Sequence, residues 1–118
     1  MRESPRETAL NFLVGEHQLP RDMAEQTLAL ADTVLRDGLS RLKAAAEAGD
    51  LATCLETAHG LKGNLLNLGL PELAQVAHAV VAAARSGEAA ASRRLAAELV
   101  RSVVPFFAAT GEESPVVG

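Results

Sequence analysis

His59, Lys62 and Gly63 are the residues of this sequence whose types and spacing are best suited to chemistry. They fall within a segment that we predict to be a helix over residues 51–68, where residues three and four apart stack on one face. Neutral imidazole is a good nucleophile near neutral pH. A phosphoryl group on the ring would carry negative charge, which the Lys62 ammonium one turn away would stabilise. The trio therefore has the chemistry of a phosphoryl-accepting site.

Two glycines inside this predicted helix lower its stability, so another role should explain their presence. Gly60 and Gly63 each cost about 1 kcal/mol relative to alanine. One interpretation is clearance, because the missing side chain at Gly63 would let a bulky group sit on the ring of His59. The alternative is close helix packing at both glycines, beside a surface histidine with no chemical role. The spacing alone leaves both interpretations open.

Helical periodicity separates the histidine from the core of its own helix. At about 100° per residue, one apolar arc contains every third or fourth position, and His59 lies opposite the centre of that arc. The predicted core residues are Cys54, Ala58, Leu61, Leu65 and Leu68. The opposite face is completed by Leu55, Glu56 and Leu66, so we expect an exposed patch around the histidine.

The rest of the chain must position this helix, and it reads as helical throughout. Alanine and leucine dominate, while β-branched and aromatic residues are sparse. Glycine, proline and polar breaks divide the 118 residues into helical segments at 6–14, 21–48, 51–68, 71–85 and 88–108. Pro105 should kink the last segment or end it early. We expect one all-α domain over residues 1–118, ordered over about 6–109 with a flexible tail at 110–118. Its architecture should be an up-down antiparallel four-helix bundle with a short extra N-terminal helix.

Composition excludes several classes of function. The formal net charge is -4 and only 3% of residues are aromatic, so we expect no nucleic-acid partner. No apolar run approaches the ~20 residues of a membrane helix, and a single cysteine fits a reducing cytoplasm. We expect a cytoplasmic monomer without a membrane partner. No phosphate-binding loop or dinucleotide fingerprint is present, so we expect no ATP site and no cofactor.

The stretch from Ala58 to Leu73 closely resembles the signature of the histidine phosphotransfer (HPt) domain family. The pattern is a histidine, a lysine three residues on, glycines four and ten residues on, and a leucine-rich helix start, here His59, Lys62, Gly63, Gly69 and Leu73. The resemblance implies a helical bundle whose accessible histidine carries a phosphoryl group in a two-component phosphorelay. It implies a receiver domain or a hybrid histidine kinase as partner, with a divalent metal only in the receiver.

Two further positions follow from the resemblance. Related domains often carry a second histidine nineteen residues after the first, and His78 stands there as a candidate partner of the site. Some members have an arginine near the phosphate, at the position of Arg85, although a solvated helix-end charge is the simpler interpretation. The family often has Gln or Glu where this chain has Val81, so the orientation of the ring must come from elsewhere.

The same face is expected to dock the partner, through Leu55, Glu56, Leu66 and Asn67. Two other functions remain open at this point. One is a non-catalytic adaptor that binds a signalling partner through the same surface. The other is a metal-binding bundle built from His59, His78 and Glu56, which lacks any recognised ligand spacing and has Lys62 as a repelling neighbour.

Overall fold

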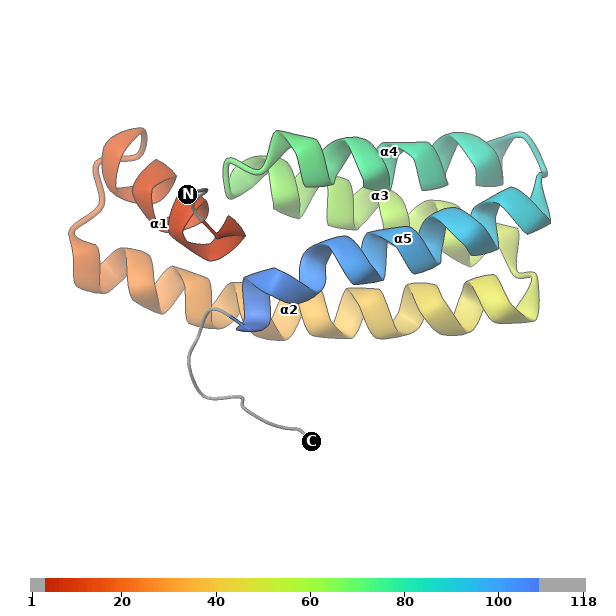
Figure 1. Ribbon diagram of the computed structural model, residues 1–118, viewed down its shortest axis with the longest axis horizontal. Coiled ribbons are helices and arrows are strands. Elements are labelled where there is room, and N and C mark those ends of the chain that lie inside the picture. Colours follow the sequence, from red (N-terminus) through yellow and green to blue (C-terminus); the bar gives the residue numbers. More distant parts are fainter. Residues whose placement is uncertain (1–3, 109–118) are drawn as a thin grey trace.

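The computed structural model describes residues 4–108, which form five helices (Figure 1). They are α1 (Pro5–Gly15), α2 (Arg21–Ala48), α3 (Leu51–Asn67), α4 (Pro71–Arg85) and α5 (Ala89–Ala108). No strand occurs within this described range. The all-helical fold class is therefore confirmed, and each predicted helix lies within one residue of an observed one at both ends. The predicted tail at 110–118 lies outside the described residues.

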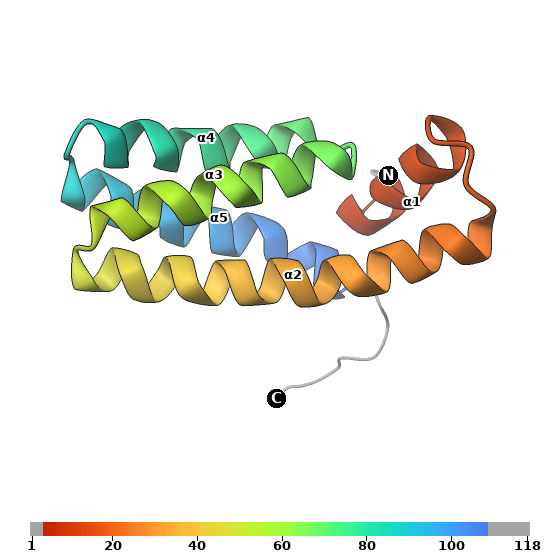
Figure 2. The ribbon, with the colours of Figure 1, turned by 180° about the vertical axis from the view of Figure 1, so that it is seen from behind.

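Helices α2 to α5 lie lengthwise beside one another, and the chain reverses direction at each of the three turns that join them (Figures 1 and 2). Helix α3 contacts α2 and α4, and helix α5 closes the group by contacting α2 and α4. The short helix α1 packs against α2 and α5 at one end of this group. As a result α3 has two flanking grooves, one toward α2 and one toward α4.

The turn between α2 and α3 shows how local sequence sets the start of the helix that carries His59. Gly49 has a φ of 74°, a left-handed conformation that ends α2 with little strain. Asp50 then caps α3, because its carboxylate accepts hydrogen bonds from the Thr53 hydroxyl at 2.6 Å and the Thr53 backbone N–H at 3.2 Å. These two bonds, the hydroxyl one most, hold the pKa of the Asp50 carboxyl below its ordinary value.

The buried face of α3 is the one that the periodicity predicts. All five residues of the predicted arc are buried: Cys54, Ala58, Leu61, Leu65 and Leu68. Burial raises the pKa of the Cys54 thiol, with a smaller contribution from the Asp50 carboxylate, and a buried thiol of this kind is unreactive. Because this arc is anchored in the core, the opposite face of α3 is directed to solvent.

Gly38 is the point of closest approach between α2 and α3. A Cβ atom added there would lie 2.7 Å from Leu61 Cδ2, closer than real side chains come. A glycine inside a helix weakens it locally. In the structure its missing side chain makes room for Leu61, which is 2% exposed.

Of the two effects expected of Pro105, a kink or an early end of α5, the early end is wrong. The helix continues through Pro105 to Ala108. Proline removes one backbone N–H, and so one hydrogen bond of the last turns. Val103 and Phe106, on either side of Pro105, are both fully buried, so core packing holds the last turn in place.

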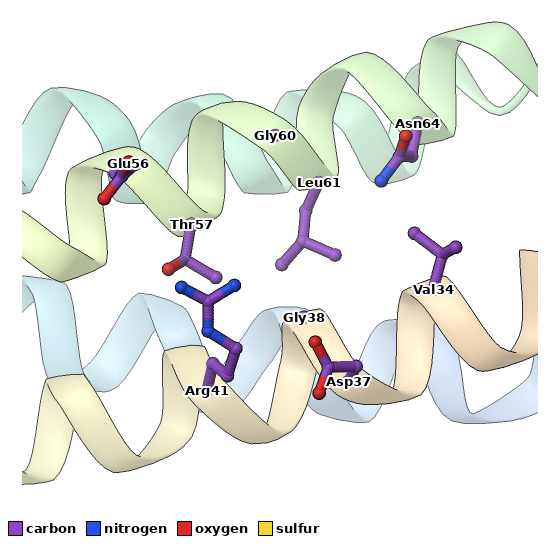
Figure 3. A pocket seen from close by; sticks show the side chains of 9 residues that line it. All are labelled: Val34, Asp37, Gly38, Arg41, Glu56, Thr57, Gly60, Leu61 and Asn64. Atoms are coloured by element: carbon purple, nitrogen blue, oxygen red, sulfur yellow. The ribbon is translucent and has the colours of Figure 1, made fainter.

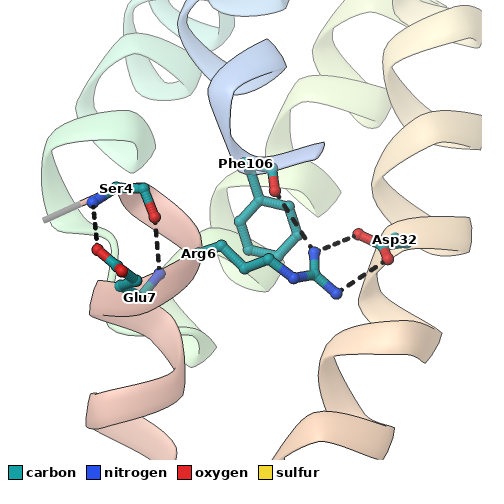
Figure 4. Close-up of polar contacts among 5 residues, drawn as sticks. All are labelled: Ser4, Arg6, Glu7, Asp32 and Phe106. Carbon is teal, nitrogen blue, oxygen red and sulfur yellow. Dashed lines mark hydrogen bonds and ion pairs between the residues drawn. The ribbon is translucent and has the colours of Figure 1, made fainter. Parts of the chain in front are cut away.

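Helix α1 is joined to the bundle by a polar cluster centred on Arg6 (Figure 4). The guanidinium donates to both carboxylate oxygens of Asp32 on α2, at 2.8 and 3.1 Å, and to the Phe106 carbonyl at 3.4 Å. It also lies 5.0 Å from the centre of the Phe106 ring. Ser4 and Glu7 form a reciprocal capping box that starts the helix. The ends of the described chain therefore meet at one arginine.

We expect Asp32→Asn to lower the free energy of unfolding by about 1–3 kcal/mol, because it removes a paired charge from a two-pronged, half-buried contact. The side chains of Arg6 and Asp32 are 17% and 21% exposed, so solvent screens this pair incompletely. Chemical denaturation measures the loss. As a control, Glu25→Gln breaks the exposed Arg21–Glu25 pair and should cost less than about 0.5 kcal/mol. Equal losses in the two variants would contradict the prediction.

Candidate functional site

His59 stands on the outward face of α3 and is exposed. Lys62 lies one turn further along and is half-buried, while Gly63 is exposed beside it. The histidine and its two neighbours thus share a solvent-facing surface whose reverse side is core. A partner can approach the imidazole without any movement of the bundle.

The two glycines beside the histidine have open space around them. A Cβ atom added at Gly60 or at Gly63 would meet nothing within 4 Å apart from its chain neighbours and the backbone of α3 itself. The alternative of close helix packing at these positions is therefore wrong, and the glycine that does serve close packing is Gly38 on α2. The space next to His59 is left free by this chain, which fits clearance for a group bound to the ring or for an approaching partner.

His78 returns to this region on α4, where it meets the lysine of the site. The Lys62 ammonium lies 3.3 Å from His78 Nδ1. An ammonium group can only donate, so this contact requires Nδ1 to accept, with the proton of the neutral ring on Nε2. The contact places His78 beside the lysine of the site, and a role for His78 in positioning Lys62 stays a prediction. The sequence placed His78 near the site, and the tertiary structure shows which residue it contacts.

The other two positions taken from the resemblance lie further along α4. Val81 is 2% exposed and belongs to the core, so its side chain offers nothing polar to the imidazole. Arg85 is exposed in the last turn of α4 and forms no hydrogen bond or ion pair with another described residue. A positive charge at a helix C-terminus is stabilised by the helix dipole, whether or not a phosphoryl group is near. A role for Arg85 near a phosphoryl group stays a prediction.

The four predicted docking residues lie on both sides of the histidine. Leu66 is 47% exposed and lines a depression of about 290 Å³ between α3 and α4, together with Lys62 and His78. Leu55 is half-buried and packs against the core, so it offers less surface than a fully exposed leucine would. Glu56 and Asn67 are exposed and line hollows on the α2 side of α3. Their role in docking stays a prediction.

One of these hollows is a groove between α2 and α3 that the sequence did not reveal (Figure 3). It has a volume of about 200 Å³. We call it the α2–α3 groove, and its polar and glycine lining consists of Asp37, Gly38, Arg41, Glu56, Thr57, Gly60 and Asn64. The only hint of this groove in the sequence is a glycine on each of the two helices, Gly38 and Gly60. These glycines predict a groove only once it is known which residues of α2 lie opposite which residues of α3.

The described residues offer no support for the metal-binding alternative. No group of three or more His, Cys, Asp or Glu side chains within residues 4–108 is arranged to hold a metal ion. In the same range, no helix is both long and apolar enough to cross a membrane.

The fold and the site define a class of protein: a helical module that presents an exposed histidine with a lysine one turn away on the same helix face. A family model described as "Hpt domain" matches residues 21–104, which is most of the chain and includes α2, α3, α4 and most of α5. The chain belongs to the Hpt domain family. No curated protein and no solved structure matches it. Helix α1 precedes the matched region.

Membership places the chain in a known kind of signalling. Hpt domains are phosphocarrier modules of two-component phosphorelays, they use no ATP, and they interact with receiver domains and histidine kinases. The resemblance drawn from His59, Lys62, Gly63, Gly69 and Leu73 is thus confirmed at the level of the family. The residues of this chain that perform the transfer are argued below.

We expect Gly63→Gln to separate stability from function. The added Cβ atom has open space around it, and the better helix propensity of glutamine should raise the free energy of unfolding by about 0.5–1 kcal/mol. The same side chain would occupy the space beside His59, so phosphoryl transfer should fall about tenfold or more. Thermal melting and the transfer rate are the two measurements. As a control, Ala44→Gln at an exposed position of α2 should leave the transfer rate unchanged. An unchanged transfer rate in Gly63→Gln would contradict the idea that Gly63 keeps the space beside His59 open.

Proposed function

We propose that this protein carries a phosphoryl group on His59, which it accepts from or donates to an aspartate of a receiver domain. The observation that carries the proposal is the arrangement on α3: an exposed imidazole, an ammonium one turn away, and an open stretch of backbone at Gly63. The up-down arrangement of α2 to α5 is the scaffold that we propose holds this face rigid. The carrier needs no cofactor of its own, and the divalent metal belongs to the receiver.

The transfer step uses the ring nitrogen farther from the backbone. The Nε2 lone pair of neutral His59 attacks the phosphorus of the receiver's aspartyl phosphate. The N–P bond forms as the bond between phosphorus and the carboxylate oxygen breaks, and the aspartate leaves as a free carboxylate. The ring then carries a proton on Nδ1 and the phosphoryl group on Nε2, and it releases the proton to solvent. Lys62 stabilises the negative oxygens, and His78 holds Lys62 in reach.

The chemical nature of the acquired phosphate tests this proposal. The protein is incubated with labelled phospho-receiver domains, and the label it acquires is treated with acid and with base. A phosphoryl group on histidine is lost in acid and retained in base, which is the expected result. No transfer from any receiver would overturn the proposal and leave the adaptor function, in which the same surface binds a partner without chemistry. Three expectations stay predictions: the flexible tail at 110–118, the cytoplasmic location and the monomeric state.

A further inference from the structure

The α2–α3 groove lies beside His59 on the side away from the positive charge of the site. Lys62 and His78 occupy the α4 side of the histidine. Glu56 and Gly60, three residues before and one residue after His59, line the groove on the α2 side. A partner domain that reaches the imidazole from solvent must therefore cover the rim of this groove as well.

Thr57 gives the groove an unused hydrogen-bonding group. Its side chain points from α3 toward α2 in Figure 3, the residue is only 7% exposed, and Oγ1 has no hydrogen-bond partner among the described residues. A buried hydroxyl without a partner destabilises the folded protein. A hydrogen-bond donor of a partner that entered the groove could bond to this hydroxyl oxygen. The polar atom that destabilises the free protein would then form a hydrogen bond in the complex.

The charges of the groove are also unpaired. Asp37 and Arg41 lie one turn apart on α2, Glu56 lines the groove from α3, and the Arg41 guanidinium points toward Thr57 (Figure 3). None of the three forms an ion pair with another described residue. Two carboxylates against one guanidinium leave the lining with a net negative charge. With the Thr57 hydroxyl, these carboxylates offer acceptors to a cationic group, and an ammonium or guanidinium carries only donors.

We propose that the α2–α3 groove receives a lysine or arginine side chain of the receiver domain that docks on His59. This proposal rests on the phosphotransfer function proposed above and names a determinant of partner recognition. The phosphoryl oxygens lie toward Lys62, and the partner's cation lies on the opposite side of the imidazole, toward Asp37 and Glu56. Opposite charges on the two sides of one nucleophile fix the orientation in which the receiver docks.

The test measures docking separately from the reactivity of His59. The probe is the receiver domain that transfers fastest to the wild-type protein, and kcat/KM for its transfer is measured for each variant. Each value is divided by the rate of labelling with phosphoramidate, a small P–N donor that reaches the histidine without docking. The variants are Asp37→Asn/Glu56→Gln and Thr57→Val, and the control is Glu98→Gln, an exposed carboxylate on α5.

We expect the normalised rate of the double variant to fall about tenfold at low salt and to depend less on salt than that of the wild type. Thr57→Val should transfer several-fold more slowly although its melting temperature rises, which excludes unfolding as the cause. The control should match the wild type. Unchanged or increased normalised rates in the groove variants would overturn the groove proposal while the carrier function stands. Failure of the wild type to take label from any receiver or from phosphoramidate would overturn both.

Discussion

A His59→Gln variant should acquire no phosphoryl label above background from any receiver domain, while its melting temperature stays that of the wild type. Glutamine is close in size but has no nucleophilic nitrogen, because its amide lone pair is delocalised. The replaced side chain is exposed, so the free energy of unfolding should change by less than about 0.5 kcal/mol. Loss of label would then reflect chemistry alone.

The chain supplies its own controls, since it contains three histidines and the structure shows all three exposed. His17 lies in the connection before α2, where its ring meets the edge of Phe12, and His17→Gln should be labelled like the wild type. His78→Gln should be labelled several-fold more slowly, because Lys62 loses the group that positions it. Label that persists in His59→Gln and disappears in one of the other two would move the assignment to that residue.

Gly69→Ala should lower the free energy of unfolding by about 2–4 kcal/mol, the largest stability effect that we expect from one methyl group. Gly69 has a φ of 73°, which costs an alanine about 1 kcal/mol. The added Cβ would also overlap the Phe12 side chain of α1, lying 2.6 Å from Cδ1 and 2.7 Å from Cβ. Overpacking of this kind costs a further 1–3 kcal/mol or so. Chemical denaturation measures the sum.

Gly87→Ala is the matched control for this prediction. Gly87 has almost the same conformation, with a φ of 75°, and nothing lies within 4 Å of an added Cβ. It should therefore lose only about 1 kcal/mol, from conformational strain alone. The excess at Gly69 should shrink but not vanish when both variants are compared in a Phe12→Ala background, because alanine removes the ring but keeps the Cβ atom that lies 2.7 Å from the added one. Equal losses at the two glycines in the wild-type background would show that contact with α1 contributes nothing.

The role of Gly69 shows how a family pattern and a structure complement each other. The pattern marks the glycine ten residues after the histidine without giving a reason for it. In the structure this glycine closes the α3–α4 turn under the ring of Phe12, and that turn brings His78 back to Lys62. Phe12 lies in α1, outside the region that the family model matches, so the family pattern could not show this contact.

What the sequence determined by itself was local. The helix bounds, the buried arc of α3 and the outward direction of His59 all follow from turn residues and from a period of 3.6 residues. Such patterns depend only on neighbours in the chain, so they could be predicted without knowing how the helices pack. The same argument was wrong in allowing Pro105 to end α5 early, because the burial of Phe106 one residue later is a tertiary contact.

The tertiary structure decided which residues of different helices meet. It paired His78 with Lys62, left Gly60 and Gly63 open while closing Gly38 against Leu61, and placed Thr57 above the charges of α2. These outcomes depend on the rotation of each helix about its axis and on its register against its neighbours. Both are set by the summed packing of side chains that are distant in the sequence, which no spacing within a single helix contains.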